Sequence, residues 1–209
     1  KSKRTLNNLF IKNELDAVIN NSFIINSNST YGIVGESGSG KTTIAKTILG
    51  LLTTTHGKLC FNNRKIDLTR KYRDRDFRKN VSMIFQDSIG SLSPRVKIKD
   101  LISEPFKIHK INKINIKEEV VKLLESVGLS SDFLERYPHQ LSGGQAKRVS
   151  IARAIALKPK LLIADEPTAG LDVSIQGEIL NLLKSIQNDQ GMSILIISHN
   201  LSVIRHLTD

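Results

Sequence analysis

The fold is decided by the segment Gly35-Glu36-Ser37-Gly38-Ser39-Gly40-Lys41-Thr42, which matches the pattern G-x-x-x-x-G-K-[ST]. The preceding residues Thr30 to Val34 form a short apolar run that predicts a buried strand. The following residues Lys41 to Leu52 have apolar side chains at helical spacing. The pattern is informative only between a strand and a helix, and this sequence supplies both. We therefore predict a phosphate-binding loop that leads from a strand into a helix.

The residue types in this loop suit a nucleoside triphosphate. Glycine lets the backbone curl so that successive N–H groups face one phosphate at the positive end of the following helix. We expect Lys41 to reach the β and γ phosphates and to support catalysis, and Thr42 to offer its hydroxyl to Mg²⁺. The predicted contacts of the loop with ATP are Gly35, Glu36, Ser37, Gly38, Ser39, Gly40, Lys41, Thr42 and Thr43.

Two adjacent acids follow the apolar run Leu161 to Ala164, which predicts a second buried strand. In P-loop enzymes an aspartate at this place, here Asp165, holds Mg²⁺, usually through water. Glu166 would orient or deprotonate the water that attacks the γ phosphate. On its own, Asp165-Glu166 before Pro167 is also compatible with a helix start; beside the glycine loop it indicates a hydrolytic site.

The remaining pattern alternates between strands and helices. Further strands are predicted at Val81 to Phe85 and Met192 to Ile197, and the second is preceded by a helix that ends at Gly191. A hairpin with an Asn62-Asn63 turn, a mostly helical stretch from Ile98 to Leu157 and a capping box at Asn115 and Glu118 complete the prediction. This order predicts an α/β fold with a mainly parallel sheet, a small antiparallel part and a helical insert.

Composition narrows the class of protein. The 209 residues contain 31 Lys and Arg against 20 Asp and Glu, a formal net charge of +11 that suits a nucleotide, a nucleic acid or a lipid headgroup. The single cysteine, Cys60, excludes an internal disulfide and a cysteine metal cluster, so a reducing compartment such as the cytoplasm is expected. No apolar run approaches the roughly 18 residues that a membrane helix needs.

A second glycine-rich segment, Leu141-Ser142-Gly143-Gly144-Gln145, precedes an apolar helix and resembles the signature of the ABC ATPases. Other elements of that family are matched in order: Gln86 resembles the Q-loop, Ala169 to Asp172 the D-loop, and His199 the switch histidine. The resemblance covers nearly the whole chain and implies one P-loop NTPase domain of the ABC ATPase fold. It also implies an ATP-binding core at 1–95 and 158–209 and a helical signature subdomain at 96–157.

The resemblance implies a site shared between two domains. Two nucleotide-binding domains of this family close head to tail, so that ATP on one P-loop is covered by the signature of the partner. This implies that Ser142, Gly143, Gly144 and Gln145 contact nucleotide across the interface, and that Asp172 of the D-loop also belongs to the nucleotide-binding residues. His199 would be a catalytic residue that binds the γ phosphate in its own chain. Gln86 would contact nucleotide and Mg²⁺ and link them to the helical insert. The partner would be a second ATPase subunit, either a related chain or another copy.

Three segments resemble the oligopeptide, dipeptide and nickel importers of this family: Phe85 to Arg95, Tyr137 to Gln140, and Leu171 to Gln176. That branch implies two transmembrane permease subunits, an extracytoplasmic substrate-binding protein and a peripheral location at the cytoplasmic face of the membrane. The implied cargo is a peptide, nickel or a metal chelate. The alternatives are an ABC-type ATPase that acts on nucleic acid, which we do not expect, and a regulatory module without hydrolysis, against which Glu166 and His199 argue.

Some positions depart from the pattern of these importers. Ser88 and Ser93 replace the usual Pro and Asn, and Asn200 replaces the acid that often follows the switch histidine. Phe10 is a candidate for stacking on adenine. Because family members continue with further strands, we expect the C-terminal end of the domain to be missing from this chain.

Overall fold

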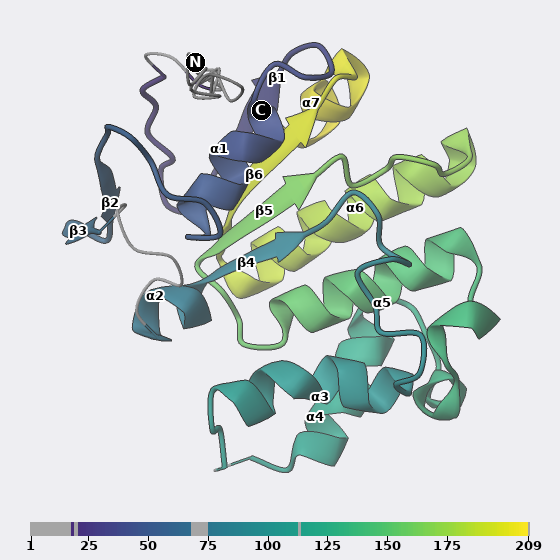
Figure 1. Cartoon of the computed structure of the whole chain (residues 1–209). Coiled ribbons are helices and arrows are strands. Elements are labelled where there is room, and N and C mark those ends of the chain that lie inside the picture. Colours follow the sequence, from purple (N-terminus) through teal and green to yellow (C-terminus); the bar gives the residue numbers. More distant parts are fainter. Residues whose placement is uncertain (1–17, 19–20, 68–74, 113, 209) are drawn as a thin grey trace, which may run out of the picture.

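The described residues of the computed structural model are 18, 21–67, 75–112 and 114–208, and they form an α/β fold (Figure 1). Four parallel strands form the main sheet in the order β1 (Thr30–Val34), β6 (Ser193–Ser198), β5 (Leu161–Asp165) and β4 (Val81–Ile84). The separate hairpin pairs β2 (Leu59–Phe61) with β3 (Arg64–Ile66) in antiparallel fashion. The predicted fold class, with its parallel sheet and small antiparallel part, is confirmed. Phe10 lies outside the described residues.

Helices connect the strands and cover the sheet. The α-helices are α1 (Lys41–Ile48), α2 (Arg75–Asn80), α3 (Ile98–Ile108), α4 (Ile116–Ser126), α5 (Gly143–Ile155), α6 (Val173–Gln190) and α7 (Leu201–Leu207). Two short 3₁₀ helices, η1 (Ser131–Glu135) and η2 (Pro138–Gln140), lie between α4 and α5. No helix in the described part of the chain is long and apolar enough to cross a bilayer.

The sheet has a hydrophobic core on each face. Successive side chains of a strand point to opposite faces, and β6 follows this rule. Ile194 and Ile196 belong to a core shared with α5, α6 and α7, whereas Leu195 and Ile197 belong to a core shared with α1 and α2. The first core continues into α3 and α4, which lie at the far end of the molecule from α1 (Figure 1). Both faces are therefore covered, as parallel sheets require.

All four strands end at nearly the same level. Val34 is in register with Ser198, Asp165 with Ile197, and Ile84 with Ala164. Parallel strands place their carboxyl ends along one edge, where open α/β sheets bind ligands. The P-loop, Glu166 and His199 follow three of these ends directly, and Gln86 follows the fourth after Phe85. The sheet therefore assembles the candidate residues along a single edge.

Local turn chemistry explains where the elements begin and end. The hairpin turns at Asn62 and Asn63, which both have positive φ (48° and 59°), as a two-residue type I′ turn requires. Helix α1 ends at Ile48 instead of the predicted Leu52, because Gly50 takes φ 75° and the backbone N–H groups of Leu51 and Leu52 turn back to the carbonyl of Lys46.

The predicted capping box of α4 is wrong. The Asn115 side chain donates to Glu118 Oε1 (2.6 Å), so the two side chains bond to each other. The Asn115 side chain accepts no hydrogen bond from a backbone N–H of the first turn, so the reciprocal pair of bonds that defines a capping box is not formed. The two residues have the spacing of a capping box, but their side chains bond each other instead of the backbone.

Candidate functional site

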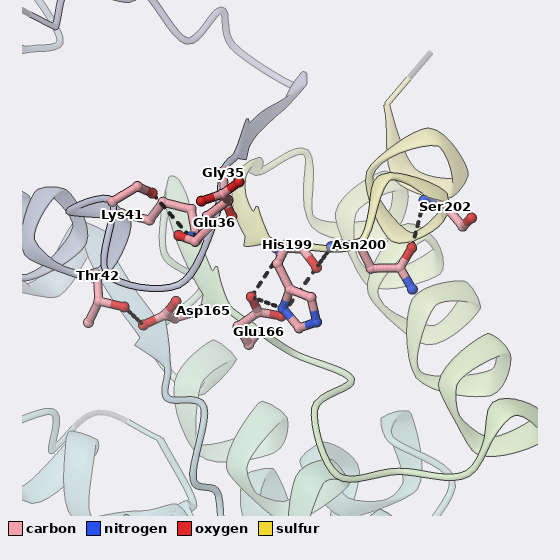
Figure 2. A network of polar contacts seen from close by, with 11 residues as sticks. Gly35, Glu36, Lys41, Thr42, Asp165, Glu166, His199, Asn200 and Ser202 are labelled. Carbon is pink, nitrogen blue, oxygen red and sulfur yellow. Dashed lines mark hydrogen bonds and ion pairs between the residues drawn. The ribbon is translucent and has the colours of Figure 1, made fainter.

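The P-loop curls around the ammonium group of Lys41 (Figure 2). Lys41 Nζ donates to the carbonyl oxygens of Gly35 (2.7 Å) and Glu36, and the residue is 8% exposed. Gly40 takes φ 88° immediately before α1, a left-handed conformation that glycine adopts without strain. A Cβ at Gly35 would lie 2.8 Å from Ser39 Oγ, so a side chain there would force the Ser39 hydroxyl to turn away.

Asp165 and Thr42 meet between β5 and α1. Thr42 Oγ1 donates to Asp165 Oδ2 (2.9 Å), as Figure 2 shows. Asp165 is 3% exposed, and its Oδ1 has no hydrogen-bond partner among the described residues. Burial raises the pKa of this carboxyl, while the hydrogen bond from Thr42 opposes the shift. A hydroxyl beside a buried carboxylate with a free oxygen is a hard oxygen set of the kind Mg²⁺ prefers, so these residues fit the ion.

Glu166 is held in a strained backbone conformation. Its φ of 46° lies in the left-handed region that non-glycine residues seldom occupy. The carboxylate accepts hydrogen bonds from Ser198 Oγ (3.2 Å, to Oε2) and from the backbone N–H of His199 (2.9 Å, to Oε1). Ser198 and His199 come from the end of β6, the strand next to β5, so the neighbouring strand fixes the direction of this carboxylate.

His199 contacts the same carboxylate through its ring. His199 Nδ1 lies 2.7 Å from Glu166 Oε1, and the His199 side chain is 67% exposed. The ring therefore contacts a buried carboxylate through one nitrogen, while most of its surface faces solvent. The next residue, Asn200, caps α7 by accepting a hydrogen bond from Ser202 N (2.9 Å). An amide oxygen performs this capping as an acid would, which accounts for the departure at this position.

The signature segment begins α5 with a capping box. Ser142 Oγ accepts from Gln145 N (3.3 Å), and Gln145 Oε1 accepts from Ser142 N (3.0 Å). A Cβ at Gly144 would lie 3.0 Å from Ile175 Cγ2, so this glycine allows close contact with α6. Helix α5 packs on the face of the sheet opposite to α1. Within the described residues no hydrogen bond joins the signature to the P-loop.

The Q-loop and D-loop lie in two different settings. Gln86 is exposed just beyond β4, and its carbonyl oxygen accepts from Lys147 Nζ (3.2 Å). Asp172 is the N-cap residue of α6 without a side-chain capping bond, and the preceding Gly170 takes φ 73°. The structure therefore brings the P-loop, Asp165, Glu166, His199 and Gln86 to one sheet edge, and leaves the signature on the helical side.

Two residues of this region were missed by sequence reasoning. Ser198 is 1% exposed and bonds Glu166, but it reads as the last residue of an apolar strand. Lys147 is 2% exposed on the packed face of α5, and burial lowers the pKa of its ammonium to about 8, although Asp87 and Asp165 oppose the shift. Its spacing of four residues from the apolar Ile151 was an available signal that this lysine is buried.

Comparison with known proteins gives a consistent result. A family model described as ABC transporter matches residues 18–169. The oligopeptide transport ATP-binding protein OppF of Streptococcus mutans is 45% identical over 199 residues, which are 94% of this chain and 65% of that protein. The oligopeptide transport ATP-binding protein AppF of Bacillus subtilis is 43% identical over 198 residues, which are 94% of this chain and 60% of that protein. The chain thus spans less than two thirds of either relative.

Solved structures share the fold. A dimeric post-hydrolysis ATP-binding cassette, MJ0796 bound to ADP and Pi, has a TM-score of 0.78 and 29% identity, covering 91% of this chain and 83% of that one. The cbiO1 protein of Clostridium perfringens, part of the ABC transporter complex cbiONQ, has a TM-score of 0.75 and 30% identity, covering 90% of this chain and 73% of that one.

Proposed function

The chain belongs to the ABC transporter family, and we propose that it is the ATP-binding and ATP-hydrolysing subunit of an oligopeptide importer. The observation that carries this proposal is the alignment of four strand ends. It puts the P-loop ammonium, a buried aspartate, a strained glutamate and an exposed histidine along one sheet edge. This arrangement supplies the groups that phosphoryl transfer to water needs, namely phosphate cradling, ion binding and orientation of the nucleophile.

Residues 35–43 bind the phosphates, and Lys41 stabilises charge on the β and γ phosphates. Thr42 and Asp165 hold Mg²⁺, with Gln86 as a further ligand, and the ion neutralises charge that develops on the phosphates. Glu166 accepts the proton of the attacking water, and His199 contacts the γ phosphate. The bonds from Ser198 and His199 aim the Glu166 carboxylate before the nucleotide binds.

The complete site requires a second cassette. The signature helix and the P-loop helix pack on opposite faces of the sheet, which supports a site in which Ser142, Gly143, Gly144 and Gln145 cover ATP held by another subunit. Asp172 then lies close to the same interface. The related cassette MJ0796 is dimeric in its ADP-bound and Pi-bound structure. The partner of this chain is either a related ATPase subunit or a second copy.

The cargo and the remaining partners are inferred from the relatives. The oligopeptide transport names of the curated proteins support a peptide cargo. We propose two permease subunits in the membrane, an extracytoplasmic substrate-binding protein, and a peripheral position at the cytoplasmic face. The division into an ATP-binding core (1–95 and 158–209) and a signature subdomain (96–157) is part of this proposal.

The proposal is tested in the assembled transporter. The full-length protein is purified with its permeases, placed in liposomes, and assayed for ATP hydrolysis with the substrate-binding protein loaded with peptide, nickel or a metal chelate. We expect stimulation with peptide only. Stimulation by nickel or a chelate would refute the cargo, and hydrolysis without any permease but with co-purifying nucleic acid would refute the importer assignment.

A further inference from the structure

Lys147 is a buried lysine that the proposed hydrolysis does not use. It lies in the second turn of α5, two residues beyond the signature segment, and it is 2% exposed. Removing an ammonium group from water is unfavourable unless hydrogen bonds and opposite charges compensate. The position of Lys147 therefore depends on its partners.

These partners belong to the Q-loop and its surroundings. Lys147 Nζ donates to the carbonyl oxygens of Phe85 (3.4 Å) and Gln86 (3.2 Å), where β4 passes into the Q-loop. The carboxylates of Asp87 and Asp165 are close enough to favour its charge. A side chain of the signature helix is thus bonded to the backbone of the residue that we propose as a ligand of nucleotide and Mg²⁺.

The same helix holds the loop at a second point. Arg153 Nη1 donates to the carbonyl oxygen of Ser91 (3.2 Å), and Arg153 Nη2 pairs with Glu104 of α3 (2.5 Å). By contrast, Arg148 donates to the carbonyl oxygen of Val127 (2.8 Å) and to Glu178 (2.7 Å), away from the Q-loop. Helix α5 therefore holds both ends of the segment 85–91, and Arg148 provides an internal control.

We propose that Lys147 is a positioning residue that fixes the Gln86 backbone to the signature helix. Because the two are bonded, the place of α5 sets the place of the Gln86 backbone, and with it the direction in which the Gln86 side chain projects. Carbonyl oxygens left without this donor would turn toward water and change the direction of Gln86. This inference rests on the proposed ATPase function.

The test compares three variants of the full-length protein. Lys147→Met keeps an unbranched side chain but removes the donor. Lys147→Gln has the same reach as Met but keeps a donor. Arg148→Met removes a bond to a carbonyl oxygen elsewhere on the same helix. The measurements are kcat, KM and the dissociation constant for MgATP, together with thermal unfolding.

We expect Lys147→Met to bind MgATP within about threefold of the unmodified protein and to lose about tenfold in kcat, since misplacement of a catalytic contact acts mainly on turnover. Lys147→Gln should recover part of kcat, and Arg148→Met should lose thermal stability with kcat unchanged. An unchanged kcat in folded Lys147→Met, or an equal fall in Arg148→Met, would overturn the proposal. Absence of hydrolysis by the unmodified protein would refute the proposed function instead.

A spectroscopic measurement decides the case in which Lys147→Met does not fold. These 209 residues contain no tryptophan, so Phe85→Trp places the one indole of this segment beside Gln86. In the double variant Phe85→Trp with Lys147→Gln, we expect the tryptophan emission to shift relative to Phe85→Trp alone. In the double variant Phe85→Trp with Arg148→Met, we expect the emission to stay unchanged. Identical emission in all three proteins would contradict the proposed link between α5 and the Q-loop.

Discussion

At the scale of single residues, Glu166 shows how the fold prepares a group for chemistry. The φ of 46° is unfavourable for a glutamate, and it persists because the neighbouring strand holds the carboxylate with a hydroxyl, a backbone N–H and an imidazole. Asp165, the preceding residue, is instead buried and bonded by Thr42. Two adjacent carboxylates thus have separate environments, which suits them to separate roles.

Ser88 allows a test of what a buried hydroxyl without a hydrogen-bond partner costs in stability. Its hydroxyl is buried and has no hydrogen-bond partner within the described residues, whereas the Ser91 hydroxyl donates to the Ser88 carbonyl (2.8 Å). Ser88→Ala should therefore raise the free energy of unfolding by about 1 kcal/mol, because it removes an unsatisfied polar group. Ser91→Ala, the matched control, should lower it by about 1 kcal/mol. Urea denaturation of both variants checks the signs, and a loss of stability in Ser88→Ala would contradict this account of the loop.

At the scale of elements, the local pattern of the sequence was sufficient for some features. The strand Thr30–Val34 and the C-terminal cap at Gly191 were predicted because hydrophobic period and glycine chemistry are local signals. The pairing of Ser198 with Glu166 and of Lys147 with Gln86 could not be predicted, because each bond joins segments that only the sheet topology brings together. The P-loop could be predicted because its residues form a contiguous sequence motif. Ser198 and Lys147 belong to no such motif.

The cap of α7 gives a prediction for an element end. Asn200 Oδ1 accepts from Ser202 N, which satisfies one of the free N–H groups at the start of the helix. Asn200→Ala should lower the free energy of unfolding by about 1 kcal/mol, and Asn200→Asp should be close to neutral, since both Asn and Asp are favoured caps. Chemical denaturation measures the two values. Equal losses in both variants would show that the capping bond does not explain why Asn is tolerated here.

The end of α3 gives a prediction for pH dependence. Burial lowers the pKa of His109, and Arg75, Arg78 and Lys79 of α2 lower it further. The unfolded chain then binds a proton at a higher pH than the folded one, so this contribution to stability is complete above the unfolded pKa near 6.5 and is lost as the pH falls below it. Glu104 and Arg153 also line this region and form an ion pair with each other.

His109→Gln should therefore remove part of the pH dependence. Between pH 8 and pH 5 we expect the unmodified protein to lose stability relative to His109→Gln, by less than about 1 kcal/mol because the group is only partly buried. Thermal or urea unfolding at each pH gives the difference in the free energy of unfolding between the two proteins. Contributions of the other titrating groups, which both proteins share, cancel in this difference. A difference that does not change with pH would contradict the lowered pKa.

At the scale of the whole molecule, the sheet separates the two phosphate-binding devices. The P-loop leads into α1 on one face and the signature begins α5 on the other. In the proposed head-to-tail dimer, each of these two segments faces the complementary segment of the same partner. The net charge of +11 suits the anionic nucleotide, but charge did not distinguish this partner from a nucleic acid. The P-loop and signature motifs, together with the similar ABC transporter proteins, favour a nucleotide over a nucleic acid.

Mixing two inactive variants tests the composite site. Lys41→Ala lacks the P-loop cation, and Gly143→Asp puts a negative charge in the signature, where a Cβ has ordinary space (3.5 Å from Leu171). A head-to-tail dimer of the two contains one site with both parts intact. We expect each variant alone to be inactive and the mixture to regain ATP hydrolysis at concentrations where the unmodified protein is active. No recovery on mixing would contradict the composite site.

We propose that the sheet edge hydrolyses ATP with Glu166 as the group that activates water. Phosphate release and MgATP binding are measured side by side for the full-length protein, for Glu166→Gln and for Glu178→Gln, a control at an exposed acid on α6. We predict that all three bind MgATP within about threefold, and that only Glu166→Gln loses turnover, by about 10²-fold or more. Turnover by Glu166→Gln equal to that of the unmodified protein would contradict the account.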